Sequence, residues 1–177
     1  MIRRERVCGL LLLLCVAVSA SGQLLNGDAH FPIINELRWE STMSEVRSLC
    51  DRHHVAMTTT DSAIVITLPV LGFASRTELQ FEQKQKTLKL VQAKFSEPTK
   101  TLADSLTSYL TLALGRGPVR TAKEKSLLII TIRMEMAVWR TSAGMVNLVT
   151  AMRGESLFDA SLIFFPPTTQ QSKGVPK

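Results

Sequence analysis

The spacing of apolar residues changes twice from helical to strand-like, and this order limits the fold more than any other feature of the sequence. Helix signals begin at Thr42 to Glu45 (TMSE), a capping-box sequence, and at Thr101 to Asp104 (TLAD). After each helix the spacing predicts three strands, at 63–68, 76–82 and 87–95 and then at 126–134, 145–152 and 157–165. We therefore predict an α+β fold with the order helix-β3-helix-β3, in which a mostly antiparallel sheet carries its helices on one face.

The N-terminus has the three parts of a secretory signal peptide. Three arginines in the first six residues precede an uncharged run from Val7 to Val18, and small residues follow at 19–22. The run is shorter than the roughly 20 apolar residues that a membrane-spanning helix needs. We predict cleavage near Ala20 or Gly22, export to the periplasm or the extracellular medium, and no stable membrane span in the mature protein.

Removal of this leader leaves about 155 residues, which is enough for one domain with its own core. We predict a signal peptide at 1–22 and a single domain at 23–167. The repeated order divides this domain into possible halves at 37–97 and 98–167. The polar residues 168–177 are predicted to form a disordered tail.

Cys50 is the single cysteine of the predicted mature chain, so an internal disulfide cannot form. It shares a helical stripe with Met43, Val46 and Leu49, and we expect a buried, structural thiol there. The alternatives are a reactive thiol at Cys50 and, if the leader is processed differently, a lipid anchor on Cys15.

The sequence contains no CxxC, HExxH or GxSxG motif and no Gly-rich phosphate loop. His53 and His54 are adjacent, and adjacent side chains on a helix point about 100° apart, so they cannot share one metal ion without further ligands. We predict no catalytic residues, no cofactor and no metal, and a binding protein rather than an enzyme.

The charges do not indicate a nucleic-acid partner. Without the leader the chain carries 18 Lys and Arg against 14 Asp and Glu, and its densest lysines, at 84–94, lie among glutamates. Nucleic-acid-binding proteins instead gather cations into a stripe on one face. We interpret these lysines as part of a solvated strand.

Two stretches resemble a group of small exported bacterial proteins. Leu37 to Val46 (LRWESTMSEV) resembles the W-G-M-S-x-x-E-V opening of their first helix, although Glu40 replaces the glycine. Leu110 to Pro118 (LTLALGRGP) resembles the L-x-x-x-Y-G-x-P that closes their second helix, with Leu114 in place of the tyrosine, and Trp139 stands where a strand tryptophan often follows. The resemblance implies the fold of the β-lactamase-inhibitor protein repeats and of the SmpA/OmlA outer-membrane lipoproteins, and it implies no functional residues.

The predicted function is that of an exported, non-catalytic protein that binds another envelope or extracellular protein, or a small ligand, through a face or edge of its sheet. Trp39, Phe164 and Phe165 are the candidate interaction residues. The alternative is a small hydrolase or lipid-handling protein. An apolar groove with convergent polar groups would indicate ligand binding, whereas a flat exposed apolar patch would indicate a protein partner. The sequence predicts neither the partner's identity nor the oligomeric state.

Overall fold

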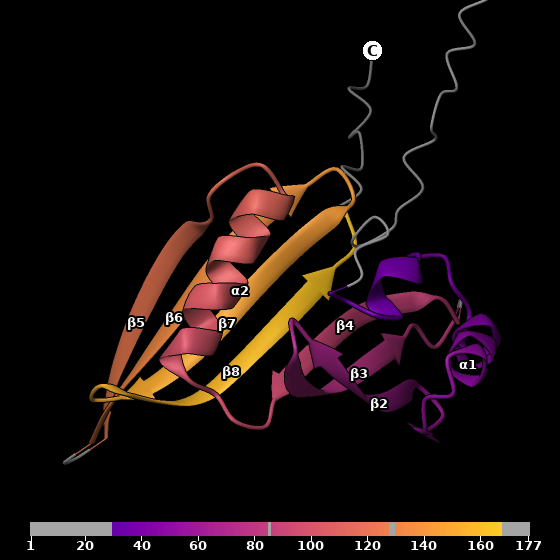
Figure 1. Cartoon of the computed structure of the whole chain (residues 1–177), viewed down its shortest axis with the longest axis horizontal. Helices are drawn as coiled ribbons and strands as arrows, with labels where there is room; N and C mark the ends of the chain where they lie inside the picture. The colour runs from indigo at the N-terminus through magenta and orange to yellow at the C-terminus, as the bar shows by residue number, and fades with distance from the viewer. Residues whose placement is uncertain (1–29, 85, 128–129, 168–177) are drawn as a thin grey trace, which may run out of the picture.

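The computed structural model describes residues 30–84, 86–127 and 130–167 (Figure 1). In chain order the elements are the 3-10 helix η1 (Ile34–Glu36), α1 (Met43–Arg52), β1 (Met57–Thr59), β2 (Ala63–Val70), β3 (Phe73–Phe81), β4 (Leu88–Phe95), α2 (Lys100–Ala113), β5 (Val119–Leu127), β6 (Ile130–Thr141), β7 (Gly144–Arg153) and β8 (Ser156–Phe165). The predicted signal peptide and the predicted disordered tail lie outside the described residues. Among the described residues, no helix is long and apolar enough to cross a bilayer.

The eight strands form one antiparallel sheet in the order β1-β2-β3-β4-β8-β7-β6-β5. Each half of the chain contributes a meander of four strands. The two meanders meet where β4 pairs with β8, the last strand of each half, with Ala93 opposite Leu162. The sheet is therefore continuous from one half to the other.

The predicted helix-β3-helix-β3 α+β fold is wrong. The described residues form one eight-stranded sheet with only two short helices, so the sheet dominates the structure. The prediction missed β1, which has three residues, and β5, whose charged side chains follow no apolar alternation. As an edge strand, β5 needs no continuous apolar face, and its lysines are typical of exposed sheet edges.

The predicted strand at 126–134 is also wrong, because the chain reverses within it. Leu127 of β5 pairs with Ile130 of β6 across the reversal. The apolar sequence SLLIITIRM contains no Gly, Pro, Asn or Asp to mark a turn, so the run reads as one strand.

The local signals at the first helix and at β4 are confirmed. Thr42 Oγ1 accepts a hydrogen bond from the Glu45 amide, and the Glu45 carboxylate accepts one from the Thr42 amide at 2.7 Å, which completes the capping box. These bonds hold the pKa of Glu45 below its usual value. Along β4 the buried side chains change parity between Leu88 and Val91, and this change coincides with a register shift beside Gln80 and Phe81 of β3, as expected for a bulge.

Two details of the second half differ from the prediction. α2 is capped by Thr99, which accepts a hydrogen bond from the Leu102 amide at 3.1 Å, rather than opening at Thr101. Alternation along the predicted strand at 157–165 would place Phe158 on the buried face of Ala160, Leu162 and Phe164, but a register shift between β7 and β8 falls beside Phe158 and leaves it half-exposed.

One face of the sheet, the inner face, is buried in a single core. Its residues alternate along the strands and meet across them in register: Ile64, Ile66, Leu68, Leu79, Val91, Ala93, Phe164, Leu162, Val146, Leu148, Trp139 and Ala137. Val46, Leu49 and Cys50 of α1 and three leucines of α2 belong to the same core.

The inner face is covered differently in the two halves. In the first half the core includes the buried residues Phe31, Ile33 and Leu37 around η1, and α1 contacts β2. In the second half α2 contacts β7 and β8, while β5 and β6 extend to the sheet edge beyond it (Figure 1). This difference leaves space between α2 and the strands at that edge.

Candidate functional site

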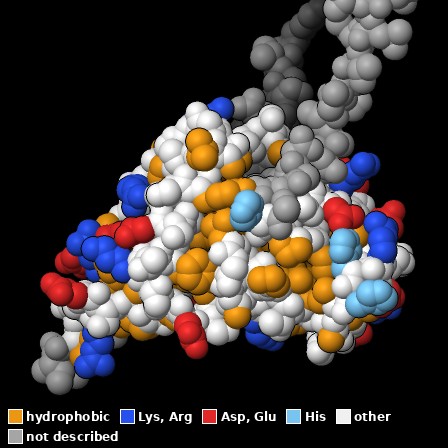
Figure 2. Space-filling model, viewed as in Figure 1, with side chains coloured by type: hydrophobic (Ala, Val, Ile, Leu, Met, Phe, Trp, Pro, Cys, Tyr) orange, Lys and Arg blue, Asp and Glu red, His pale blue; other side chains and the backbone are white. Residues whose placement is uncertain are grey.

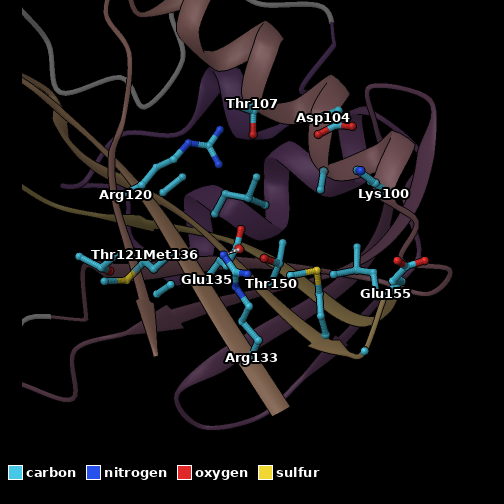
Figure 3. A pocket seen from close by; sticks show the side chains of 17 residues that line it. Lys100, Asp104, Thr107, Arg120, Thr121, Arg133, Glu135, Met136, Thr150 and Glu155 are labelled. Atoms are coloured by element: carbon cyan, nitrogen blue, oxygen red, sulfur yellow. Dashed lines mark ion pairs between the residues drawn. The ribbon is translucent and has the colours of Figure 1, made fainter. Parts of the chain in front are cut away.

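A cleft of about 700 Å³ lies between α2 and the inner face of β5, β6 and β7 (Figure 3). This volume falls within the range of roughly 300–1,000 Å³ that is typical of small-molecule sites. The structure therefore has a groove between sheet and helix at this position rather than a flat surface.

The cleft exists because three of its walls carry alanine. Ala103 comes from α2, Ala122 from β5 and Ala137 from β6, and the other apolar lining residues are Met136, Leu148, Met152 and Leu157. A larger side chain at any of the three alanines would occupy the space. The hollow is therefore encoded by residues that are small rather than by residues that are chemically distinctive.

α2 presents two different faces. Leu102, Leu106 and Leu110 are buried in the core. Lys100, Ala103, Asp104 and Thr107 line the cleft, and their spacing of three and four residues places them on one side of the helix. The same helix thus closes the core and supplies polar groups to the cleft.

Charged side chains stand at both ends of the cleft. Arg120 of β5 extends toward Thr107 in Figure 3, and no ion pair within the described residues engages its guanidinium. Lys100, Asp104 and Glu155 lie at the other end (Figure 3). Arg120 therefore supplies an uncompensated positive charge next to apolar surface.

An ion pair crosses the sheet side of the cleft. Arg133 and Glu135 are two residues apart on β6, so their side chains share the inner face, and their closest N and O atoms are 2.7 Å apart. Figure 2, viewed from the side of α2, shows basic and acidic side chains at the end of the molecule where β5 lies and again at the opposite end, with apolar side chains between them. Because the charges of Arg133 and Glu135 largely cancel, Arg120 is the unpaired charge at its end of the cleft among the described residues.

The three candidate interaction residues come together, but not at the cleft. Trp39, Phe164 and Phe165 line a void of only about 10 Å³ beside the β6–β7 turn. Trp39 is buried and its Nε1 donates a hydrogen bond to the Ala143 carbonyl at 2.7 Å, while Phe164 is buried and packs edge-on against Phe31. Phe165 is half-buried, opposite Met145. Such a void holds at most one water molecule, so these residues stabilise the fold at this position.

The cysteine and histidines of the first half lie away from the cleft. Cys50 is fully buried, which confirms the predicted burial. His53 Nε2 lies 2.6 Å from a Glu36 carboxylate oxygen, and Arg52 contacts the same carboxylate at 3.3 Å. Within the described parts of the chain no three His, Cys, Asp or Glu side chains gather as a metal site.

Sequence reasoning missed every charged residue of the cleft. One signal was present in β6 (ITIRMEMAVWRT), where Arg133 and Glu135 interrupt an apolar strand at the same parity. Two opposite charges on one face of such a strand indicate a polar site on that face. Arg120 carried no such signal, because β5 is polar throughout.

No known protein family, curated protein or solved structure matches the chain. The resemblance to the β-lactamase-inhibitor protein repeats and the SmpA/OmlA lipoproteins stays a prediction.

Proposed function

We propose that this is an exported, non-catalytic binding protein whose cleft holds a small amphipathic ligand with one anionic group. The observation that carries the proposal is the position of Arg120, whose guanidinium extends into a cleft of about 700 Å³, lined by both apolar and polar residues, without an ion-pair partner among the described residues. A carboxylate or phosphate on the ligand would accept charge-assisted hydrogen bonds from this group. The alanines and Met152 would contact the ligand's apolar body.

Burial of the ligand's apolar body would supply most of the binding free energy. Arg120 would supply the selectivity for an anionic ligand over a cationic one. An alkyl chain that loses about 300 Å² of apolar surface gains roughly 7 kcal/mol, part of which is offset by its lost translational and rotational freedom. A hydrogen bond between the Arg120 guanidinium and the ligand's anionic group would contribute about 1.5–3 kcal/mol, and a cationic ligand could not form it.

The hydrolase alternative has less support in the cleft. The residues that line it include Asp104, Glu135, Glu155 and three threonines, but among the described lining residues there is no histidine, cysteine or serine. Acyl transfer by a nucleophile activated by a neighbouring histidine therefore has no candidate pair here. The geometry favours binding without covalent chemistry.

Calorimetric titration with two ligands of equal chain length tests the proposal. Dodecanoate should bind the purified mature protein more tightly than dodecyltrimethylammonium, both used below their micelle concentrations. Arg120→Gln should weaken dodecanoate binding about tenfold and leave the cationic ligand nearly unchanged, because only the charge contact is lost. Ala122→Phe should abolish both by filling the cleft.

The matched control is Ala74→Phe, the same substitution at an exposed strand position of the first half. It should bind dodecanoate like the wild type. Equal affinity of the wild type for both ligands, or equal losses in Ala122→Phe and Ala74→Phe, would contradict the proposal.

A further inference from the structure

The second half of the sheet has an apolar outer face, on the side opposite the cleft. The register of β5–β8 places apolar side chains along it, among them Val119, Ile132, Met134, Met136, Val138, Met145, Val149, Ala151, Ile163 and Phe165. Met134 is 50% exposed and Val119 is 66% exposed. Both described helices bury their apolar stripes in the core on the inner face, so neither covers this surface.

A buried polar group lies at the centre of the outer face. Asn147 stands between Val138 and Ile163 in the register and is only 8% exposed. Its Nδ2 donates to the sulfur of Met136 at 3.8 Å, and its Oδ1 has no hydrogen-bond partner among the described residues. An unsatisfied buried acceptor costs free energy, and a donor from a bound partner would remove that cost once the flexible Met136 side chain moves.

The rim of the outer face is predominantly basic. By register and alternation the outward positions around it are occupied by Arg76, Lys94, Lys123, Lys125, Arg140 and Arg153. The acidic residues on the same side are Glu78 and Asp159, and Asp159 is paired with Lys94 at 3.5 Å. An acidic partner would therefore be attracted, and a basic one repelled.

This charge pattern argues against two other occupants. A second copy of the chain, packed face to face, would bring two basic rims together. The last ten residues of the chain (TTQQSKGVPK) contain two lysines and no acidic residue, so they match neither the rim nor the apolar centre.

A lipid surface fits less well than a peptide. Anionic headgroups would match the rim, but acyl chains cannot donate a hydrogen bond to Asn147, whereas a glutamine on the apolar side of a peptide helix can. From Ile132 to Arg140 the outward side of β6 spans about 27 Å, which a helix of about 18 residues would cover.

We propose that the outer face of β5–β8 binds an acidic amphipathic helix of a partner protein. The helix lays its apolar side on Met134, Met136 and Val138, and its acidic flanks face the basic rim. The sheet is then covered on both faces in its second half, by α2 on one side and by the partner's helix on the other. Met136 borders the cleft as well, whereas Met134, Val138 and Val119 do not line it, so variants at Met134 and Val119 test the outer face separately from the cleft.

Fluorescence anisotropy with labelled peptides tests the proposal on the intact mature protein. One peptide of about 18 residues carries Leu and Met with one central Gln, the donor for Asn147, on one side of the helix and Glu on the other, and the second carries Lys in place of every Glu. The acidic peptide should bind at least tenfold more tightly, with an affinity that falls as salt is added. Met134→Glu and Val119→Glu should each weaken it at least tenfold.

The matched control is Leu112→Glu, at a large apolar residue of α2 that is 83% exposed. It should leave peptide binding unchanged, and circular dichroism should show every variant folded. Lys123→Glu, a rim variant that removes no apolar surface, should weaken the acidic peptide and strengthen the basic one. Equal affinity for the two peptides, an equal loss in Leu112→Glu, or binding of phosphatidylglycerol vesicles without binding of the acidic peptide would overturn the proposal.

Discussion

At the residue scale, Cys50 shows how burial changes the chemistry of one group. The thiol is fully enclosed in the core beneath α1. Loss of water raises its pKa, and the negative charge of Asp51 raises it further. The thiolate is the reactive form of cysteine, so the folded protein suppresses the chemistry that a free thiol would otherwise have.

Cys50 should therefore react slowly with a thiol reagent in the folded protein and rapidly in denaturant. Because its folded pKa is raised, its contribution to stability is present below the ordinary cysteine pKa and is lost as the pH rises through the folded value. Cys50→Ser should lower the free energy of unfolding by about 1–3 kcal/mol, since a hydroxyl would be buried without a good partner. Urea unfolding of both proteins measures this, and fast labelling of the native wild type would contradict it.

At the element scale, the β6–β7 turn depends on a glycine. Gly144 has φ of 138°, and a Cβ at this position would overlap the carbonyl oxygen of Phe165 on β8. The neighbouring Ala143 carbonyl accepts the hydrogen bond from Trp39, so this turn also holds the segment that precedes α1. Movement of the turn would therefore disturb contacts in both halves.

Gly144→Ala should lower the free energy of unfolding by on the order of 3 kcal/mol, because backbone strain and overpacking combine. Gly154→Ala is the matched control in the β7–β8 turn. It has a positive φ of 60°, but a Cβ there meets nothing within 4 Å, so only the strain remains. Thermal unfolding that ranks Gly154→Ala as the more damaging substitution would show that the contact with Phe165 is unimportant.

The elements that sequence predicted correctly are those with local chemical signals. The capping box of Thr42 and Glu45 starts α1 from residues three positions apart, and the alternation of Arg76 to Phe81 gives β3. The errors lie where the signal was absent or non-local. β5 is polar on both faces, the reversal after Leu127 lacks a turn residue, and the β4–β8 pairing joins residues about seventy positions apart.

At the scale of the whole molecule, one sheet separates two surfaces of different character. In the first half the inner face is buried in the core. In the second half α2 contacts β7 and β8 but leaves β5 and β6 to line the cleft. The cleft was not predictable from sequence, because Ala103, Ala122 and Ala137 carry no local signal of a cavity. Only the strand register and the position of α2 bring them together. Phe165, one of the candidate interaction residues, lies on the outer face rather than in the cleft.

The most direct test of ligand binding in the cleft is an NMR titration of the mature protein with ¹³C-labelled alanine methyl groups. Dodecanoate should shift the methyl signals of Ala103, Ala122 and Ala137, which line the cleft, in one saturable step. Ala151 on the opposite face of β7 and Ala74 on β3 should remain unchanged. Saturating dodecanoate that leaves the three cleft methyls unshifted, or that shifts Ala151 in their place, would contradict the account.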